Sequence, residues 1–257
     1  MDYLGIRIEG GIICIDPTKR NGLATWKEVL DDVHDVRSTL CLFGYNHPFI
    51  KGYTHIVRPV QQLTKKDVPF VWTPECTQAI CTLKAIVSSD PMLRHPDHNR
   101  PFELEVDASQ YALGAILYQR NDGGKLQVVG YYSQTLNPAE RNYNMYDREL
   151  LAVICALAHW RHLLLGVKHQ VVVWTNHNNL TFYRHPQTIS SRVAHYIPRM
   201  AKYDLVLKHK PGTSNRADYL SRPLGVDQSV KNNENVTVLP DQLFAHALNL
   251  EDLDQEV

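Results

Sequence analysis

The sequence predicts an α/β protein whose main domain is a mixed five-stranded sheet flanked by helices. Three strand-like runs come first, at residues 101–107, 111–119 and 126–133, and the first of them alternates apolar and polar side chains. An amphipathic helical pattern follows over about 145–164. Two further strands, at 170–175 and 204–208, are separated by a helical stretch near 189–202. Three antiparallel strands followed by an αβαβα order are typical of a mixed sheet with helices packed on it.

Residues 1–100 predict a smaller α+β region in front of this domain. Residues 3–15 resemble two short strands joined by a Gly10-Gly11 turn. Residues 24–43 and 74–89 carry helical periodicity, the second beginning at Thr73 or Pro74. The Pro-rich residues 90–101 are the best internal boundary.

The remaining elements follow from turn and composition signals. Residues 121–124, Asn-Asp-Gly-Gly, predict a hairpin turn between the second and third strands of the main domain. A short helix is expected at about 215–221. We therefore divide the chain into residues 1–100, 101–223 and an acidic, flexible tail at 224–257.

Charge is distributed unevenly although the net charge is zero. Residues 158–223 hold ten Lys or Arg and only two acids, Asp204 and Asp218. Residues 224–257 hold seven Asp or Glu and one Lys. This pattern indicates a phosphate-binding face followed by a solvated extension, although an ordinary solvated surface would look the same.

The cysteine and hydropathy patterns predict an intracellular protein, cytoplasmic or nuclear. The five cysteines have no paired CxxC spacing, which favours a reducing compartment and disfavours a zinc site. No segment approaches the roughly 18 consecutive apolar residues of a membrane span, and the N-terminus has no signal-like apolar block. We therefore expect no membrane partner.

Acidic side chains in separate elements are the main functional signal. Asp107 ends a strand, Glu149 opens an apolar helix and Asp218 follows a Pro-Gly turn. Asn176 follows the strand at 170–175, where a fourth carboxylate would be expected. Carboxylates that converge on one point make an oxygen-only pocket suited to paired Mg²⁺ ions, and such a pair can cut a phosphodiester.

Several motifs resemble one known family. They are Phe102-Glu-Leu-Glu-Val-Asp107, Gly130-Tyr-Tyr-Ser-Gln-Thr-Leu, Glu140-Arg-Asn-Tyr143, Asp147-Arg-Glu149-Leu-Leu-Ala and Pro211-Gly-Thr-Ser-Asn-Arg-Ala-Asp218. In this order they resemble the ribonuclease H domain of reverse transcriptases from Ty3/gypsy-type retrotransposons. Residues 1–100 resemble the thumb and connection that precede that domain in the polyprotein. The resemblance implies a ribonuclease H-like five-stranded sheet over 101–223.

The same resemblance implies the roles of the site residues. Asp107, Glu149 and Asp218 take the family's metal-binding positions, and Asn176 stands where the family has Asp. The implied reaction is metal-dependent endonucleolytic hydrolysis of the RNA strand of an RNA–DNA hybrid during reverse transcription. Two Mg²⁺ ions are implied, with Mn²⁺ as a possible substitute. Asn supplies only a neutral oxygen, so we expect one ion site to be weakened and activity to be impaired.

His209 and several cations can be interpreted either as functional residues or as ordinary surface residues. His209 is a candidate for moving a proton during product release, although it also fits a surface-loop histidine. Five cations are candidates for a track along the phosphate backbone, although each alone fits a plain solvated charge: Arg192, Arg199, Lys202, Lys208 and Lys210.

Two classes of function remain open from the sequence. The first is a ribonuclease H-type endonuclease that belongs to a reverse transcriptase and integrase polyprotein. The second is a catalytically inactive nucleic-acid-binding or scaffolding module, and a translated pseudogene fragment is a further possibility. The Tyr-x-Asp-Asp polymerase motif is absent from the sequence, so we expect no polymerase activity from this chain. Asn176 is compatible with a decayed element, a domesticated gene or an engineered substitution.

Overall fold

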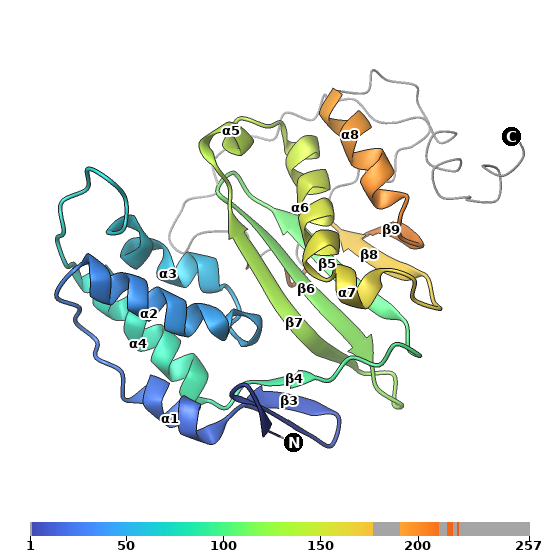
Figure 1. Ribbon diagram of the computed structural model, residues 1–257. Coiled ribbons are helices and arrows are strands. Elements are labelled where there is room, and N and C mark those ends of the chain that lie inside the picture. Colours follow the sequence, from blue (N-terminus) through green and yellow to red (C-terminus); the bar gives the residue numbers. More distant parts are fainter. Residues whose placement is uncertain (1, 177–190, 211–214, 218–219, 221–257) are drawn as a thin grey trace, which may run out of the picture.

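The computed structural model describes residues 2–176, 191–210, 215–217 and 220. Figure 1 shows two sheets: a five-stranded sheet with helices packed on it, and a smaller N-terminal sheet that lies beside a group of helices. No helix in this described part is long and apolar enough to cross a bilayer.

The larger sheet is mixed, as the sequence predicts. β5 (Phe102–Ala108), β6 (Ala112–Arg120) and β7 (Leu126–Thr135) form an antiparallel meander. β8 (Val171–Thr175) runs parallel to β5, and β9 (Leu205–His209) runs parallel to β8. The strand order is β7-β6-β5-β8-β9. The carboxyl ends of β5, β8 and β9 therefore lie at the same edge of the sheet, although they are far apart in sequence.

Helices supply the crossovers that parallel strands need. α5 (Pro138–Arg141) and α6 (Met145–His159) follow β7, α7 (Arg161–Leu164) precedes β8, and α8 (Ser191–Met200) precedes β9. The helix predicted over 145–164 is thus divided near Trp160, whose buried side chain belongs to the core. The core of this part lies between α6, α8 and one face of the sheet.

Short-range signals explain how α6 begins. Asn144 precedes the helix, and its side chain accepts a hydrogen bond from the Asp147 backbone N–H at 2.7 Å. The buried side of the helix includes Leu150, Val153 and Leu157, and this spacing of three and four residues is that of a helix face. The same register puts Glu149 among buried residues.

The N-terminal sheet confirms the predicted hairpin. β1 (Asp2–Tyr3), β2 (Ile6–Glu9), β3 (Ile12–Ile15) and β4 (Met92–Arg94) lie in that order. The turn between β2 and β3 has φ of 58° at Gly10 and 76° at Gly11, backbone conformations that glycine adopts readily. β4 lies inside the Pro-rich stretch 90–101 and pairs with β3, so the chain returns to the N-terminal sheet just before β5 begins.

The N-terminal helices differ from the prediction. α4 (Pro74–Ser88) is confirmed, but the single helix expected over 24–43 is wrong: α1 (Pro17–Ala24) ends where it should begin, and α2 (Val33–Tyr45) starts nine residues later. The side chain of Asp32 accepts a hydrogen bond from the backbone N–H of Asp35 at 2.7 Å. This contact caps the N-terminus of α2 and explains why the helix begins at Val33. Leu30 lies in the loop between α1 and α2 and is nevertheless buried. Its apolar side chain therefore fitted the spacing of a helix although the loop is not helical. α3 (Tyr53–Gln62) and the short 3-10 helix η1 (His47–Phe49) were not predicted.

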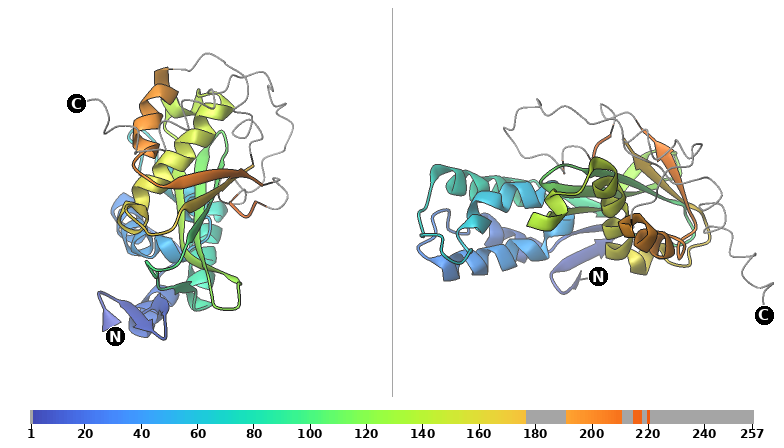
Figure 2. Two further views of the ribbon diagram at one scale, coloured as in Figure 1. Left: turned by 90° about the vertical axis from the view of Figure 1, so that its right-hand side faces the viewer. Right: turned by 90° about the horizontal axis from the view of Figure 1, so that it is seen from above.

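The two regions meet along β7. The hydroxyl of Ser133 donates to Oγ1 of Thr54 at 2.8 Å, and the Thr54 N–H donates to Oγ of Ser133 at 3.2 Å. Nε2 of His47 lies 3.2 Å from the same oxygen. Val128 and Tyr131 of β7 also pack against the core of the N-terminal helices. Figure 2, right, shows these helices gathered at one end of the molecule and α8 at the other.

Candidate metal-binding and active site

The fold brings Asp107 and Glu149 together at the carboxyl edge of the sheet. Asp107 is near the end of β5 and is 2% exposed, whereas Glu149 lies in the second turn of α6 and is fully buried. Burial and the nearby charge of Asp107 both raise the pKa of Glu149 well above its ordinary value. The Ala108 N–H and the Thr175 hydroxyl oppose this rise, and the hydroxyl lies 3.4 Å from Oε2 of Glu149. Two acids are therefore held where their negative charges repel each other.

Asn176 joins the same group of side chains. It follows β8, the parallel neighbour of β5, and its Nδ2 donates to Oδ1 of Asp107 at 2.6 Å. A residue at position 176 therefore touches the strand-borne acid directly. A carboxylate at this position would place a third negative charge beside Asp107 and Glu149.

Two oxygens at this edge allow us to test whether a cation fits. Oε1 of Glu149 and Oδ1 of Asn176 are buried and have no hydrogen-bond partner within the described part of the chain. An unsatisfied buried acceptor is costly, and more so when it belongs to an acid beside another acid. A divalent cation with oxygen ligands would relieve both the missing contacts and the repulsion. The residues present thus fit a hard cation.

Asp218 lies outside the described residues, as does His177, so only their chain neighbours can be placed. Nδ2 of Asn215 donates to the Val106 carbonyl at 2.9 Å, one residue before Asp107. Gly114 pairs with Asp107 across β5 and β6, and a Cβ added to it would lie 2.5 Å from Cβ of Leu220 and 3.1 Å from the Ala217 carbonyl oxygen. Residues 217 and 220 therefore pack closely on the strand position opposite Asp107.

His209 lies at the same edge. It is the last residue of β9 and pairs in register with Thr175, whose hydroxyl contacts Glu149. The next residue, Lys210, donates its backbone N–H to the Thr175 carbonyl at 2.7 Å. The sheet register therefore accounts for the place of His209 near the acids.

Of the five cations predicted to form a phosphate track, four have side chains in the described part of the chain, and the surroundings of these four differ. Nζ of Lys210 pairs with the buried carboxylate of Glu105, and Nζ of Lys208 lies 5.7 Å from the ring centroid of Trp174. Arg199 and Lys202 line a pocket of about 260 Å³ between α6 and α8, together with Arg161. Arg192 is part of α8, and its side chain lies outside the described portion.

Glu105 is a buried acid that sequence reasoning missed. It is 1% exposed and accepts hydrogen bonds from the Tyr118 hydroxyl at 3.4 Å and from the Arg216 backbone N–H at 3.2 Å, besides its ion pair with Lys210. Its place two residues before Asp107, on the same side of an alternating strand, was the available signal. This network attaches residues 210 and 216 to β5, on either side of residues 211–214, which lie outside the described part of the chain.

Known proteins resemble this chain in sequence and in fold. Residues 72–173 match the family model of the RNase H-like domain found in reverse transcriptase. The Tf2-3 and Tf2-4 transposon polyproteins of Schizosaccharomyces pombe are each 37% identical over 191 residues, which is 73% of this chain and 14% of each polyprotein. The chain thus spans about one seventh of the length of these relatives.

Solved structures share the fold. The foamy viral protease-reverse transcriptase in complex with an RNA/DNA hybrid superimposes with a TM-score of 0.68 at 16% identity, over 93% of this chain and 32% of that one. The same viral protein in complex with double-stranded DNA gives a TM-score of 0.67, also at 16% identity, over 82% of this chain and 44% of that one. Residues 72–173 therefore belong to the RNase H-like domains found in reverse transcriptases, and the chain is a relative of Ty3/gypsy-type retrotransposon polyproteins.

Proposed function

We propose that this chain is the ribonuclease H-like part of a retroelement reverse transcriptase, which binds RNA–DNA hybrids and hydrolyses their RNA strand at a low rate. The observation that carries the proposal is the convergence of Asp107, Glu149 and position 176 at one sheet edge, with buried oxygens that a cation would satisfy. The relatives are polyproteins, so we further propose that it works inside the cell, in the cytoplasm or nucleus, as part of a longer reverse transcriptase and integrase chain.

Each residue has a defined task in this proposal. Asp107, Glu149 and Asp218 would hold two Mg²⁺ ions, or Mn²⁺ in their place. When bound, such a pair supplies Lewis-acid catalysis for phosphodiester hydrolysis. Burial of Glu149 keeps water away from its carboxylate and strengthens its attraction for a cation. His209, at the same edge, would move a proton during product release.

Asn176 lowers the activity in two ways. It contributes no negative charge, and Mg²⁺ gives up its water reluctantly unless its ligands are anionic and well placed. Its amide N–H also occupies Oδ1 of Asp107, an oxygen that a cation would need. Both effects weaken the cation site.

One observation favours a second candidate, a binding module without catalysis. The hydrogen bond from Asn176 to Asp107 partly satisfies the site without any cation. A protein that keeps the fold and the hybrid-binding surface while its metal site has lapsed would retain this contact.

A cleavage assay separates the two candidates. A labelled RNA–DNA hybrid is incubated at saturating Mg²⁺, and in parallel Mn²⁺, with the natural chain, with Asn176→Asp, and with Asn176→Asp combined with Asp107→Asn. We expect Asn176→Asp to cut at least about a hundredfold faster than the natural chain, because a preorganised charge at the reacting centre contributes several kcal/mol. The Asp107→Asn combination should cut no faster than background.

Other results have clear meanings. If the natural chain cuts as fast as Asn176→Asp, the impairment is refuted. If neither protein cuts, but both bind the hybrid with an affinity that falls as salt rises, the binding module is the correct reading.

A further inference from the structure

A groove lies between α3 and the segment that joins β7 to α6. Its volume is about 420 Å³, and its lining includes Arg58 and Lys65 on one wall and Arg141 on the other. No acidic side chain is among the lining residues within the described part of the chain. The rest of the lining is mixed: Thr54, His55, Gln61, Gln62, Thr64, Tyr111, Thr135 and Asn137 offer hydrogen-bonding groups, and Ala112, Leu136 and Pro138 are apolar. Such a concave, cationic, amide- and hydroxyl-rich surface suits phosphate oxygens.

The two arginines of this groove, Arg58 and Arg141, are held in place by their neighbours. The Arg58 guanidinium carbon lies 5.3 Å from the ring centroid of Tyr111, a stacking arrangement that orients its planar donors. Nε of Arg141 donates to the Leu136 carbonyl at 3.1 Å. Both guanidinium groups are on exposed residues, so they reach solvent while one side of each is fixed.

The groove is connected to the acidic site through the backbone. Tyr111 is four residues after Asp107, in the turn that leads from β5 to β6. Its carbonyl accepts from the Leu136 N–H at 2.9 Å, and its own N–H donates to Oγ of Ser109 at 3.0 Å. The two walls are also joined by the hydrogen bonds between Thr54 and Ser133. The groove is thus a fixed extension of the sheet edge that carries Asp107.

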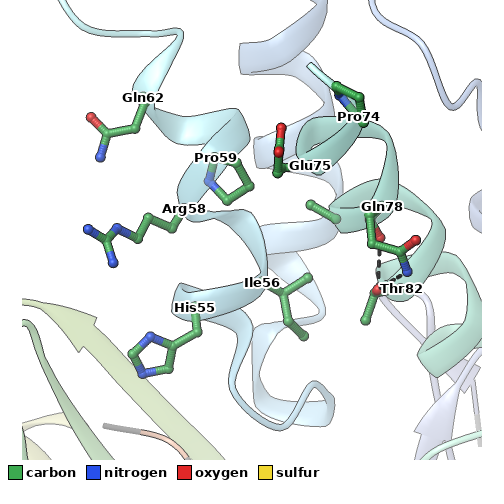
Figure 3. A pocket seen from close by; sticks show the side chains of 10 residues that line it. His55, Ile56, Arg58, Pro59, Gln62, Pro74, Glu75, Gln78 and Thr82 are labelled. Carbon is green, nitrogen blue, oxygen red and sulfur yellow. Dashed lines mark hydrogen bonds between the residues drawn. The ribbon is translucent and has the colours of Figure 1, made fainter. Parts of the chain in front are cut away.

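A larger pocket on the other side of α3 is less suited to phosphate. It has a volume of about 870 Å³ and lies between α3 and α4 (Figure 3). Glu75 and Arg58 both line it, and the Arg58 side chain points away from α4 in Figure 3. The acidic Glu75 of this pocket and the direction of the Arg58 side chain therefore both favour the groove beside Tyr111 as the phosphate-binding site.

We propose that this groove positions the hybrid by gripping its phosphate backbone through Arg58, Lys65 and Arg141. The proposal rests on the proposed function, and it assigns these three as positioning residues outside the acidic site. Two of them belong to the region before residue 101 and one to the RNase H-like domain. The groove would therefore fix where along the hybrid the cut falls, and it would require both regions of the chain.

The test compares Arg58→Ala combined with Arg141→Ala against Arg37→Ala, an exposed arginine of α2 that lines neither pocket. Hybrid affinity is measured in Ca²⁺ at several salt concentrations with the full chain. Cut positions are mapped in Mg²⁺ with the same changes made in the Asn176→Asp protein. A third protein, Arg141→Glu, reverses one charge without touching the Tyr111 stack.

We expect the double variant to bind several-fold more weakly and its log–log salt slope to flatten by about 0.9 for each lost phosphate contact, or about 1.8 in all. Its cuts should spread over neighbouring positions, whereas Arg37→Ala should match its parent. Arg141→Glu should bind more weakly than its parent, because the reversed charge repels phosphate. An unchanged slope and an unchanged cut map would overturn the groove even if Asn176→Asp cleaves well. A flattened slope with no cleavage by any protein would support the groove and refute the proposed nuclease.

Discussion

At the scale of single residues, three of the buried acids of β5 and α6, Glu105, Asp107 and Glu149, differ in how their charges are compensated. Glu105 forms an ion pair with Lys210, and Asp107 accepts a hydrogen bond from the side-chain amide of Asn176. Within the described residues, Glu149 receives a long hydroxyl contact, a backbone N–H and the charge of nearby Arg148, and one of its oxygens has no hydrogen-bond partner there. A buried charge without a cation costs stability, so Glu149 is the acid whose presence is hardest to explain by structure alone.

The Glu149→Gln variant tests this cost. Because burial raises the pKa of Glu149 above its ordinary value of 4.5, the folded chain binds more protons than the unfolded chain above that pH, and stability falls as the pH rises. We expect Glu149→Gln to be more stable than the natural chain at pH 8, by about 1–3 kcal/mol, and nearly equal to it at pH 4. Urea titrations at both pH values measure the difference. A gap of constant size at the two pH values would contradict this assignment.

At the scale of elements, the sequence predicted what is local. Strand-like composition and the turn at residues 121–124 predicted β5, β6 and β7 almost to the residue. α3 escaped notice because Pro59 interrupts it and Gly52 precedes it, although Ile56, Val57 and Val60 form its buried side. The helix expected over 24–43 failed because apolar burial in a loop looked periodic.

The candidate site was predicted from motifs, and the convergence itself could not be derived locally. Asp107, Glu149 and Asn176 stand on three elements that meet only because β8 lies beside β5 in the sheet order. Residue spacing does not encode that order. The pairing of Glu105 with Lys210 was missed for the same reason, since 105 residues separate its members.

The close packing of residues 217 and 220 on β6 gives a prediction at this scale. A side chain at Gly114 would collide with Leu220, so Gly114→Ala should displace this segment and Asp218 within it. We expect a loss of about 1–3 kcal/mol in stability, and loss of most of the cleavage by the Asn176→Asp protein. Gly123→Ala is the matched control, because its nearest neighbour would be at 3.5 Å. Equal activity of the two alanine variants would argue against a role for the segment in the site.

At the scale of the whole molecule, β7 joins the two regions into one unit. Ser133 and Thr54 exchange hydrogen bonds across this contact, and the His47 ring lies against it. Burial, with a smaller effect from nearby His159, lowers the pKa of His47 from 6.5 to about 4. The ring is therefore neutral in the folded chain at neutral pH.

The contact between the two regions along β7 should weaken in acid. The unfolded chain protonates this histidine near pH 6.5 and the folded chain only near pH 4, so stability present above 6.5 is lost as the pH falls through that window. The shift corresponds to roughly 3 kcal/mol. We expect His47→Phe, which keeps a ring against Tyr53, to lose less stability than the natural chain between pH 6.5 and pH 4. Urea unfolding at each pH measures the loss. Equal losses of stability in the two proteins would show that His47 does not control the contact between the two regions.

The central claim is that the buried acids at the sheet edge form a divalent-cation site weakened by Asn176. Titration calorimetry with Mn²⁺ tests it most directly, using the natural chain, Asn176→Asp and Asp107→Asn. Asp107→Asn sets the background, which includes any binding to the mostly exposed group of Asp32, His34 and Asp35. We predict weak binding above that background for the natural chain and binding at least about tenfold tighter for Asn176→Asp, equivalent to 1.4 kcal/mol or more. Identical isotherms for all three proteins would contradict the account.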